Sequence, residues 1–398
     1  MTTSDETLVI DNIGLLVTND AELGNGPLGK TYDAAVVVAD GRVVAIEKAG
    51  VSADRQIDAA GRCVIPGFVD SHTHMVFAGD RSEEFAARMA GEPYTGGGIA
   101  VTTSATNEAS DEELRIATAG RVAEARAAGI THLEIKSGYG LTVDGETRLL
   151  RIANEFTEDT TFLGAHVVPP GTSADRYVDL VTGEMLDSAK PHARFVDVFC
   201  EEGAFDADQS MRVLEAGLAA GLIPKIHANQ LGPGSGVQIA VAVDAASADH
   251  CTYLVDADID ALAGSNTVAT FLPASDFSTR QPYPDARRLL DAGATAAIAT
   301  NCNPGSSYTT SMSFCIALAV RDMHMTVDEA LWAATAGGAA ALRRMDIGRL
   351  APGMCADIVV LDAPAHSHLA YRPGVPLVAA TLQRGVVVAE RKTDRASS

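Results

Sequence analysis

Short apolar runs that alternate with helical stretches fill the middle of this chain, and they restrict its fold more than any other feature. Continuous apolar runs of this kind are typical of strands buried on both faces, and helices between them indicate parallel βαβ units. Helical patterns occupy residues 111–129 and 210–221, among others. Eight runs can be counted, at residues 63–69, 131–135, 160–165, 194–199, 222–226, 245–248, 267–272 and 294–299.

Eight parallel strands with intervening helices predict an α/β fold, a (β/α)8 TIM-like barrel, which needs about 250 residues. The alternative arrangement of such units is a doubly wound open sheet. That fold carries a G-x-G-x-x-G loop after its first strand when it binds a dinucleotide, and no such loop follows residues 63–69. We therefore expect the barrel.

Both ends of the 398-residue chain have a different pattern. Residues 8–18, 33–50 and 377–390 alternate apolar and polar side chains around turn sequences, which is typical of strands with one buried face. The two ends enclose the barrel pattern, so they predict one small domain assembled from both. We expect a composite β-sandwich from residues 1–64 and 348–398, and a catalytic barrel from residues 65–347.

The charge of the chain excludes some partners. With 52 acidic and 30 basic residues the net charge is −22, so we expect neither nucleic acid nor an anionic membrane surface as a partner. No apolar run reaches the roughly 20 residues of a membrane span, and the acidic N-terminus lacks a signal-peptide pattern; the cytoplasm is the expected location. The six cysteines form no C-x-x-C pair, which argues against a disulfide framework or a zinc knuckle.

Histidines gather directly after the predicted strands. In barrel enzymes the active site lies at the carboxyl ends of the strands, so side chains at these positions should meet. Other polar residues, including Lys136 and Asp249, stand at the same positions. Five of the ten histidines are found there: His72, His74, His166, His227 and His250.

His72 and His74 form the sharpest local signal in the chain. Residues i and i+2 at the end of a strand point the same way, so two imidazoles can hold one metal ion. An isolated H-x-H pair can also just cap a strand. The three other strand-end histidines favour the metal site, and imidazole ligands suit zinc or iron.

The sequence V-I-P-G-F-V-D-S-H-T-H, followed by histidines after strands five and six, resembles the amidohydrolase superfamily. Within it, the chain looks most like the enzymes that hydrolyse 4-imidazolone-5-propanoate to N-formimidoyl-L-glutamate in histidine degradation. The resemblance covers nearly the whole chain. The matching stretches are HTHMVFAGDRSEEF (72–85), EIKSGYGL (134–141), FLGAHVVPP (162–170), VFCEEGAF (198–205), KIHANQLG (225–232), SADHCTYL (247–254) and NCNPGSSY (301–308).

This resemblance implies one Zn²⁺ or Fe³⁺ ion per chain, an anionic small-molecule substrate, and a role for each matching residue. The metal ligands would be His72, His74, His227 and Asn301. The catalytic residues would be His250, Gln230 and Asn301, and the substrate would be bound by Arg81, Tyr139, His166, Gln230, Asn303, Gly305 and Ser306.

The chemistry of the substrate agrees with these roles. Its carboxylate suits the forked guanidinium of Arg81, and the Gly-rich turn at Gly305 can offer backbone N–H groups to an anion. Simpler explanations also exist: Arg81 could form an ion pair with Glu83 or Glu84, and Tyr139 could merely pack a turn. We interpret Lys136 as structural.

Asn301 departs from the pattern that the resemblance implies, which has Asp at the end of the eighth strand. An amide oxygen can coordinate a metal weakly, but it cannot serve as a general base at neutral pH. Three explanations compete: an engineered or conditional substitution, which we favour; a natural variant in which His250 or another group takes the proton; and a non-catalytic binder that keeps the fold.

Two other functions stay open at this point. The chain could be an amidohydrolase that acts on another cyclic amide or on a nucleobase, in which case Arg81 would have no carboxylate to bind. It could also be a metal-free binding paralogue, for which Asn301 is the only argument. We further expect a homodimer, although the sequence itself does not determine the oligomeric state.

Overall fold

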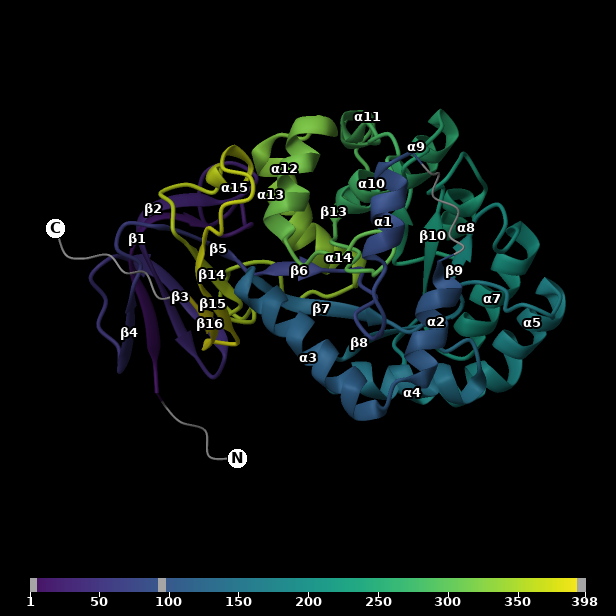
Figure 1. The fold of residues 1–398 in the computed structure, drawn as a ribbon. Coiled ribbons are helices and arrows are strands. Elements are labelled where there is room, and N and C mark those ends of the chain that lie inside the picture. The colour runs from purple at the N-terminus through teal and green to yellow at the C-terminus, as the bar shows by residue number, and fades with distance from the viewer. Residues whose placement is uncertain (1–5, 92–97, 392–398) are drawn as a thin grey trace.

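The computed structural model describes residues 6–91 and 98–391. A barrel of strands surrounded by helices carries a smaller sheet at one side, to which both ends of the described chain contribute (Figure 1). The part of the chain that the structure describes holds no helix long and apolar enough to cross a membrane.

The barrel consists of eight strands that follow one another in space in their chain order, from β6 to β13. Every neighbouring pair is parallel. The predicted α/β barrel is therefore confirmed. Its strands are β6 (Phe68–Asp70), β7 (Ile130–Lys136), β8 (Asp159–Ala165), β9 (Phe195–Cys200), β10 (Ile223–Ala228), β11 (Ser247–His250), β12 (Val268–Phe271) and β13 (Ala296–Ile298).

Helices follow the strands and cover the outside of the barrel (Figure 1). Side-chain caps start several of them, for example Ser110 before α3 and Asp206 before α7, and the amide of each cap donates in return to the side chain of the third helical residue. The helices are α1 (Ser82–Met89), α2 (Ile99–Glu108), α3 (Asp111–Ala127), α4 (Val143–Ala153), α5 (Ala174–Leu180), α6 (Leu186–Ala189), α7 (Ala207–Ala219), α8 (Gly236–Ala242), α9 (Asp256–Ala263), α10 (Pro273–Thr279), α11 (Ala286–Asp291), α12 (Met312–Asp322), α13 (Val327–Trp332), α14 (Gly338–Ala341) and α15 (His368–Tyr371), with the short turns η1 (Val181–Met185), η2 (Lys190–His192) and η3 (Ala333–Gly337).

The first and last barrel strands are joined just beyond their ends. The amide of Asn301 donates to the carbonyl of His72 at 3.0 Å, and the amide of His74 donates to the carbonyl of Cys302 at 3.3 Å. Thr300 reinforces this seam, because its amide donates to a carboxylate oxygen of Asp70 at 3.0 Å. The seam therefore places Asn301 beside the two histidines of the H-x-H pair.

The smaller sheet has strands from both ends of the chain, as predicted. Its order is β16-β15-β14-β5-β1-β2-β3, and β4 also pairs with β1. The predicted domain boundaries stay a prediction; residues 1–5 and 392–398 of that domain lie outside the described residues. The strands are β1 (Leu8–Val17), β2 (Lys30–Ala39), β3 (Arg42–Lys48), β4 (Arg55–Asp58), β5 (Cys63–Pro66), β14 (Ile358–Leu361), β15 (Val378–Gln383) and β16 (Val386–Glu390).

Buried contacts fasten the smaller sheet to the barrel. The amide group of Asn19 donates to Thr335 Oγ1 and to the carbonyl of Gly348, both at 2.8 Å. On β15, Thr381 donates to the carbonyl of Arg126 at 2.7 Å, and Gln383 donates to the carbonyl of Thr131 at 2.8 Å. A single apolar core cluster includes residues of both parts.

One predicted barrel strand is wrong in detail. The run at residues 63–69 is two strands: β5 pairs with β1 and β14 in the smaller sheet, and β6 pairs with β7 in the barrel. Gly67 separates them, and its amide donates to the carbonyl of Asp357 at 2.8 Å. A Cβ at this position would lie 2.2 Å from Thr131 Oγ1, so only glycine lets the chain pass between the two sheets.

This close approach predicts that Gly67→Ala destabilises the protein by about 1–3 kcal/mol, the usual cost of overpacking a tight site. Chemical denaturation would measure the change in the free energy of unfolding. Gly120→Ala is the control: Gly120 lies within α3, where an added Cβ meets no atom within 4 Å, so alanine should stabilise by about 0.5–1 kcal/mol. An equal effect of the two substitutions would contradict the argument.

Candidate active site

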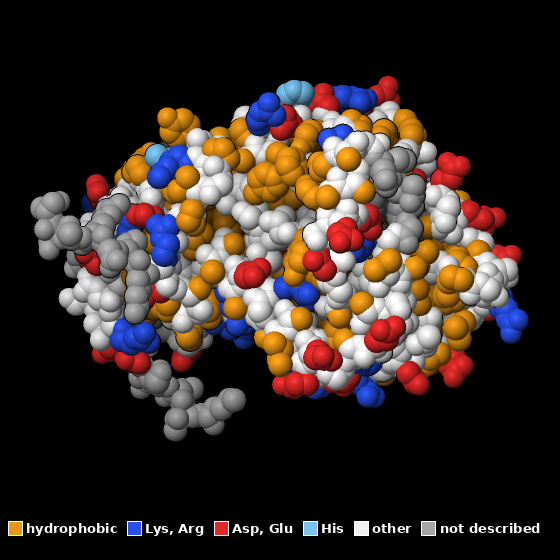
Figure 2. Space-filling view, viewed as in Figure 1, with side chains coloured by type: hydrophobic (Ala, Val, Ile, Leu, Met, Phe, Trp, Pro, Cys, Tyr) orange, Lys and Arg blue, Asp and Glu red, His pale blue; other side chains and the backbone are white. Residues whose placement is uncertain are grey.

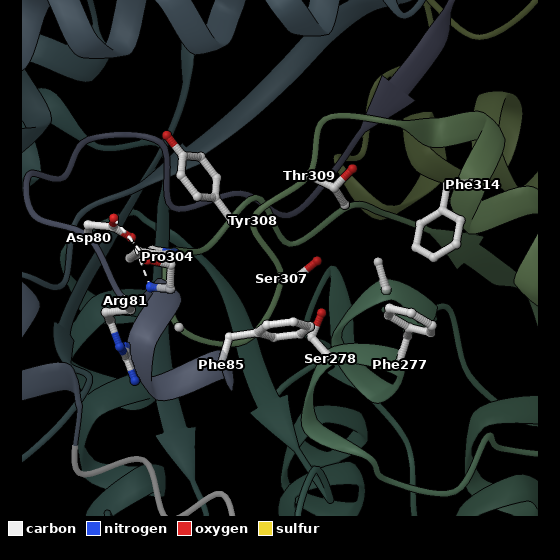
Figure 3. A pocket seen from close by; sticks show the side chains of 13 residues that line it. Asp80, Arg81, Phe85, Phe277, Ser278, Pro304, Ser307, Tyr308, Thr309 and Phe314 are labelled. Carbon is white, nitrogen blue, oxygen red and sulfur yellow. Dashed lines mark hydrogen bonds between the residues drawn. The ribbon is translucent and has the colours of Figure 1, made fainter. Parts of the chain in front are cut away.

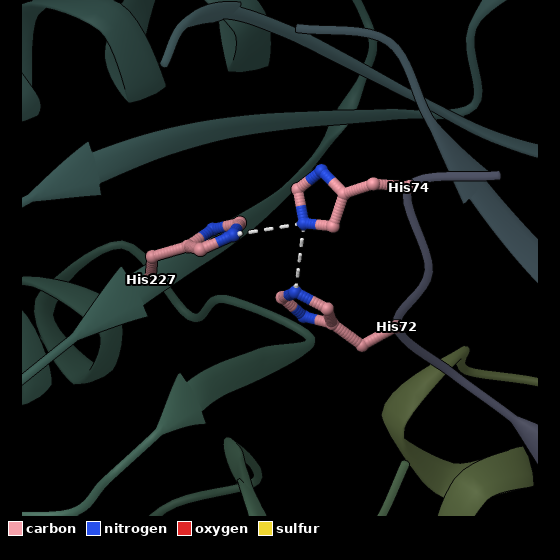
Figure 4. A group of neighbouring side chains, drawn as sticks. All are labelled: His72, His74 and His227. Carbon is pink, nitrogen blue, oxygen red and sulfur yellow. Dashed lines mark hydrogen bonds between the residues drawn. The ribbon is translucent and has the colours of Figure 1, made fainter. Parts of the chain in front are cut away.

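Three histidines meet in the centre of the barrel at the carboxyl ends of the strands. His72 and His74 follow β6, and His227 lies in β10; all three are buried. Their side chains point toward one another (Figure 4), with Nε2 of His74 at 3.2 Å from Nε2 of His72 and at 3.4 Å from Nε2 of His227. One ligand atom from each lies within 4.8 Å of the others, so the three can hold a metal ion together.

Two buried carboxylates orient these histidines from behind. Nδ1 of His72 lies 2.6 Å from Asp249 Oδ2, and Nδ1 of His227 lies 3.1 Å from Asp197 Oδ1. A carboxylate on Nδ1 fixes the tautomer, so that Nε2 presents its lone pair to the centre of the site. Neither carboxylate was in our predicted site.

Lys136 connects the two carboxylates. Its Nζ is buried and lies 2.8 Å from Asp197 Oδ2, 2.8 Å from Glu134 Oε1 and 3.7 Å from Asp249 Oδ2. Burial by itself would raise the pKa of Asp197, but the charges of His227 and Lys136 hold it below its ordinary value. Burial would likewise lower the pKa of Lys136, and Asp197, Glu134 and Asp249 raise it instead. Asp197 and Lys136 are therefore ionised, and these ion pairs fit the structural role that we expected for Lys136.

His72 and His74 are uncharged. Burial lowers the pKa of His72 and of His74 well below the ordinary value, and neighbouring positive charges and histidines lower it further. A neutral imidazole is the form that binds a metal ion. The donor set, the buried carboxylates behind it and the protonation state therefore all fit a metal centre.

Asn301 lies at the seam of the barrel with a left-handed backbone, φ 67°. Its Nδ2 donates to Ser306 Oγ at 2.9 Å. Its Oδ1 is buried and has no hydrogen-bond partner among the residues that the structure describes. A buried amide oxygen without a partner is costly, so this atom is a fourth donor suited to a cation.

Two further histidines complete the ring of imidazoles. His250 lies in β11, and its ring centroid is 5.4 Å from that of His227 and 5.7 Å from that of His72. His166 stacks on His74 with a centroid distance of 5.4 Å, and its Nδ1 lies 2.8 Å from the carbonyl of Gly138. Burial lowers the pKa of His166 to about 4, so it is neutral.

A pocket opens on these groups and gathers most of the predicted site. Ile99, from the start of α2, and Phe199, from β9, are lining residues that the sequence did not single out. No local signal marks them, because an apolar residue at a strand or helix end is ordinary. The predicted residues among the lining are His74, His166, His227, Gln230, His250, Asn301, Asn303 and Ser306.

Arg81 stands at the edge of the site rather than in this pocket. It is buried, and its guanidinium forms a forked contact with Glu84, from Nε at 2.8 Å and from Nη2 at 2.7 Å. The ion pair that we weighed as the simpler explanation is thus present. Gly305 lies directly against the guanidinium, because a Cβ there would be 2.0 Å from Nη1.

A second pocket begins at Arg81 and runs outward (Figure 3). Phe85, Phe277 and Phe314 give it apolar walls. Hydrophobic side chains gather on this face of the molecule near α10 and α12, whereas acidic ones are scattered over it (Figure 2). Tyr139 lies on the inner side instead, buried and with its ring centroid 5.3 Å from that of His166.

The turn after the last strand uses its own amides. Asn303 Oδ1 accepts hydrogen bonds from the amides of Gly305 at 2.9 Å and of Ser306 at 3.2 Å. We expected these N–H groups to donate hydrogen bonds to an anion. Because Asn303 engages them in this structure, their part in binding substrate stays a prediction.

Comparison with known proteins places the chain among close relatives. The amidohydrolase family profile matches residues 234–389. Imidazolonepropionase from Mycolicibacterium smegmatis is 63% identical over 390 residues, 97% of this chain and 98% of the relative. Imidazolonepropionase from Streptomyces coelicolor is 62% identical over 383 residues, 95% of this chain and 98% of the relative.

Solved structures share the fold at low identity. A variant of atrazine chlorohydrolase from Arthrobacter aurescens, complexed with zinc and atraton, has a TM-score of 0.74 at 18% identity and covers 98% of this chain and 97% of its own. An adenosine deaminase from Xanthomonas campestris with bound zinc has a TM-score of 0.69 at 20% identity, covering 96% of this chain and 92% of its own. With relatives above 60% identity over nearly its whole length, the chain belongs to the imidazolonepropionase family of amidohydrolases.

Proposed function

We propose that the protein hydrolyses the cyclic amide of 4-imidazolone-5-propanoate to N-formimidoyl-L-glutamate, a step of histidine degradation. The observation that carries this proposal is the convergence of His72, His74 and His227 at a pocket lined by Gln230, His166 and Asn303, in a chain of this family. The relatives that carry the name of that activity match this chain over nearly their full length.

We infer that one Zn²⁺ or Fe³⁺ ion binds to His72, His74, His227 and the amide oxygen of Asn301. The buried Oδ1 of Asn301, which has no partner in the described residues, supports its place in this set. When bound, the ion would supply Lewis-acid activation of water and of the ring carbonyl. Asp249 and Asp197 hold the imidazoles ready for it.

The residues proposed to bind the substrate fall into two groups, one for its carboxylate tail and one for its ring. We propose that Arg81 attracts the carboxylate tail, with Ser306 and Gly305 beside it, and that Gln230, Tyr139 and His166 surround the ring. A guanidinium binds a carboxylate in a planar, forked geometry. Glu84 already occupies one edge of the Arg81 guanidinium, and Gly305 lies directly against the guanidinium.

Asn301 cannot take the proton of the attacking water, because an amide is not a base at neutral pH. We propose that His250 takes it at a ring nitrogen. Burial lowers the pKa of His250, which keeps the ring neutral but makes it a weaker base, and its Nδ1 has no partner in the described part of the chain. Proton transfer would then be less direct than with a carboxylate at position 301.

The finer points about partners and location stay predictions. The substrate is proposed to be a small anion, and we expect the metal, Arg81 and the amides of the turn at Gly305 to offset the net charge of −22 locally. A homodimer, a cytoplasmic location and the lack of nucleic-acid or membrane partners remain expectations from the sequence.

Because Asp249 orients His72, we expect Asp249→Asn to weaken metal binding about 10–100-fold, the usual effect of losing a carboxylate partner of a ligating histidine. Competition with a chelator would measure the dissociation constant of the metal. Asp159→Asn is the matched control, because Asp159 is also buried and also faces a histidine, His132, outside the three-histidine group. Equal metal affinities of the Asp249 and Asp159 variants would contradict the proposed site.

Asn301→Asp tests the chemistry. A carboxylate should restore a general base, so kcat should rise by about 10²–10⁴. It also adds one negative charge to the pocket, so the anionic substrate should bind less tightly. Turnover of 4-imidazolone-5-propanoate by both proteins, with the metal content of each determined, gives the result. No turnover by either protein excludes the proposed reaction, and an equal kcat shows that Asn301 does not limit proton transfer.

Arg81→Ala tests the class of substrate. Loss of a charged hydrogen-bonding group should raise KM for 4-imidazolone-5-propanoate about 10–100-fold. Steady-state kinetics measures this change, and thermal unfolding checks that the variant folds, because Arg81 also contacts Glu84. An unchanged KM would favour a ring without a carboxylate.

A further inference from the structure

Glu201 follows the last residue of β9 and faces the loop after β10, which carries Gln230. Its Oε2 accepts two backbone hydrogen bonds, from the amide of Gln230 at 2.8 Å and from the amide of Leu231 at 3.0 Å. One carboxylate oxygen thus holds two consecutive peptide groups. Charge-assisted bonds of this kind are about twice as strong as neutral ones.

The backbone of the loop is shaped for this contact. Asn229 has a left-handed conformation, φ 53°, directly before Gln230. A left-handed residue within a turn brings successive N–H groups to one side and makes a concave site for an anion. In this structure, the side chain of Glu201 is the anion.

The other side of the same loop is anchored separately. Asn229 Nδ2 donates to the carbonyl of Tyr253 at 3.1 Å and to Asp258 Oδ2 at 3.2 Å, and the carbonyl of Asn229 accepts from the amide of Tyr253 at 3.0 Å. The segment from His227 to Leu231 is therefore fixed at two points. Glu201 is the anchor that holds Gln230 itself.

We infer that Glu201 is a positioning residue, which sets the place of the Gln230 side chain against the reacting ring through the amides of Gln230 and Leu231. Gln230 is buried and lines the histidine pocket, while Glu201 does not line that pocket and belongs to the wall of a neighbouring one. Glu201 thus acts through Gln230. This inference rests on the proposed function, which gives Gln230 its contact with the substrate.

The neighbouring Glu202 provides a matched comparison. It has the same charge and stands one residue further along, but its side chain is exposed and forms no hydrogen bond or ion pair that the described residues show. Glu202→Ala therefore removes a nearby carboxylate without removing a hydrogen bond to either amide. An effect through the two amides belongs to Glu201 alone.

The test compares Glu201→Ala, Glu201→Gln and Glu202→Ala in the metal-loaded enzyme. A misplaced group beside the reacting bond can cost about 10²-fold, so we expect Glu201→Ala to lower kcat by about 10–100-fold. KM should change little, because Arg81 still attracts the carboxylate. Glu201→Gln retains an acceptor oxygen and should recover part of kcat, and Glu202→Ala should match the unmodified protein.

Two further measurements separate positioning from a general structural role. In a Gln230→Ala background, Glu201→Ala should lower kcat by less than 3-fold, since its target is already gone. Hydrogen exchange of the segment 229–232 should quicken about 10-fold or more in Glu201→Ala, as expected when a charge-assisted bond is lost. Full additivity of the two substitutions would overturn the inference.

The outcomes also distinguish this inference from the proposed function. If the unmodified protein does not hydrolyse 4-imidazolone-5-propanoate, the proposed function fails, and the exchange measurement still reports on the contact. If the protein hydrolyses it and Glu201→Ala behaves as Glu202→Ala does, the function stands and the inference about Glu201 is wrong.

Discussion

The ion pairs of Lys136 inside the barrel are the interaction on which the site depends. Asp197 and Asp249 must be buried and charged in order to orient His227 and His72. Buried carboxylates are costly unless they are paired, and Lys136 lies against both. Lys225 adds a second positive charge, 3.8 Å from Asp249. The three-histidine group therefore rests on a layer of paired charges, and this layer keeps the imidazoles in position.

The seam between the first and last strands is the second constraint. Hydrogen bonds from Asn301 to His72 and from His74 to Cys302 close the barrel at the site itself. The same backbone contacts that complete the fold thus bring the eighth-strand residue to the histidine pair. An uncharged residue at position 301 keeps this geometry, but it offers neither the negative charge nor the base that a carboxylate there would supply. At position 301 the backbone holds the barrel closed and the side chain lines the pocket, so a substitution there can change the chemistry without changing the fold.

Much of the fold and of the site could be predicted, for identifiable reasons. The histidines of the site could be found in the sequence because each of them closely follows a predicted strand, and the carboxyl ends of the strands form the active-site face of a barrel. The sequence did not show that the run at 63–69 contributes to two sheets, because the residues on both sides of Gly67 are equally apolar. Asp197 lies inside the apolar run at 194–199, and its charge was the only feature that could have marked it as part of the site. The engagement of the Gly305 amide by Asn303 depends on the turn's three-dimensional shape and could not be read from the residues.

We propose that three imidazoles in the centre of the barrel hold one metal ion. X-ray absorption spectroscopy of the protein, purified with zinc or iron supplied, tests it most directly. We expect about one ion per chain, with imidazole nitrogen at about 2.0–2.1 Å in the zinc form and oxygen as the remaining donor. Sulfur near 2.3 Å, as cysteine ligands would give, or a chain that binds no ion under these conditions, would contradict it.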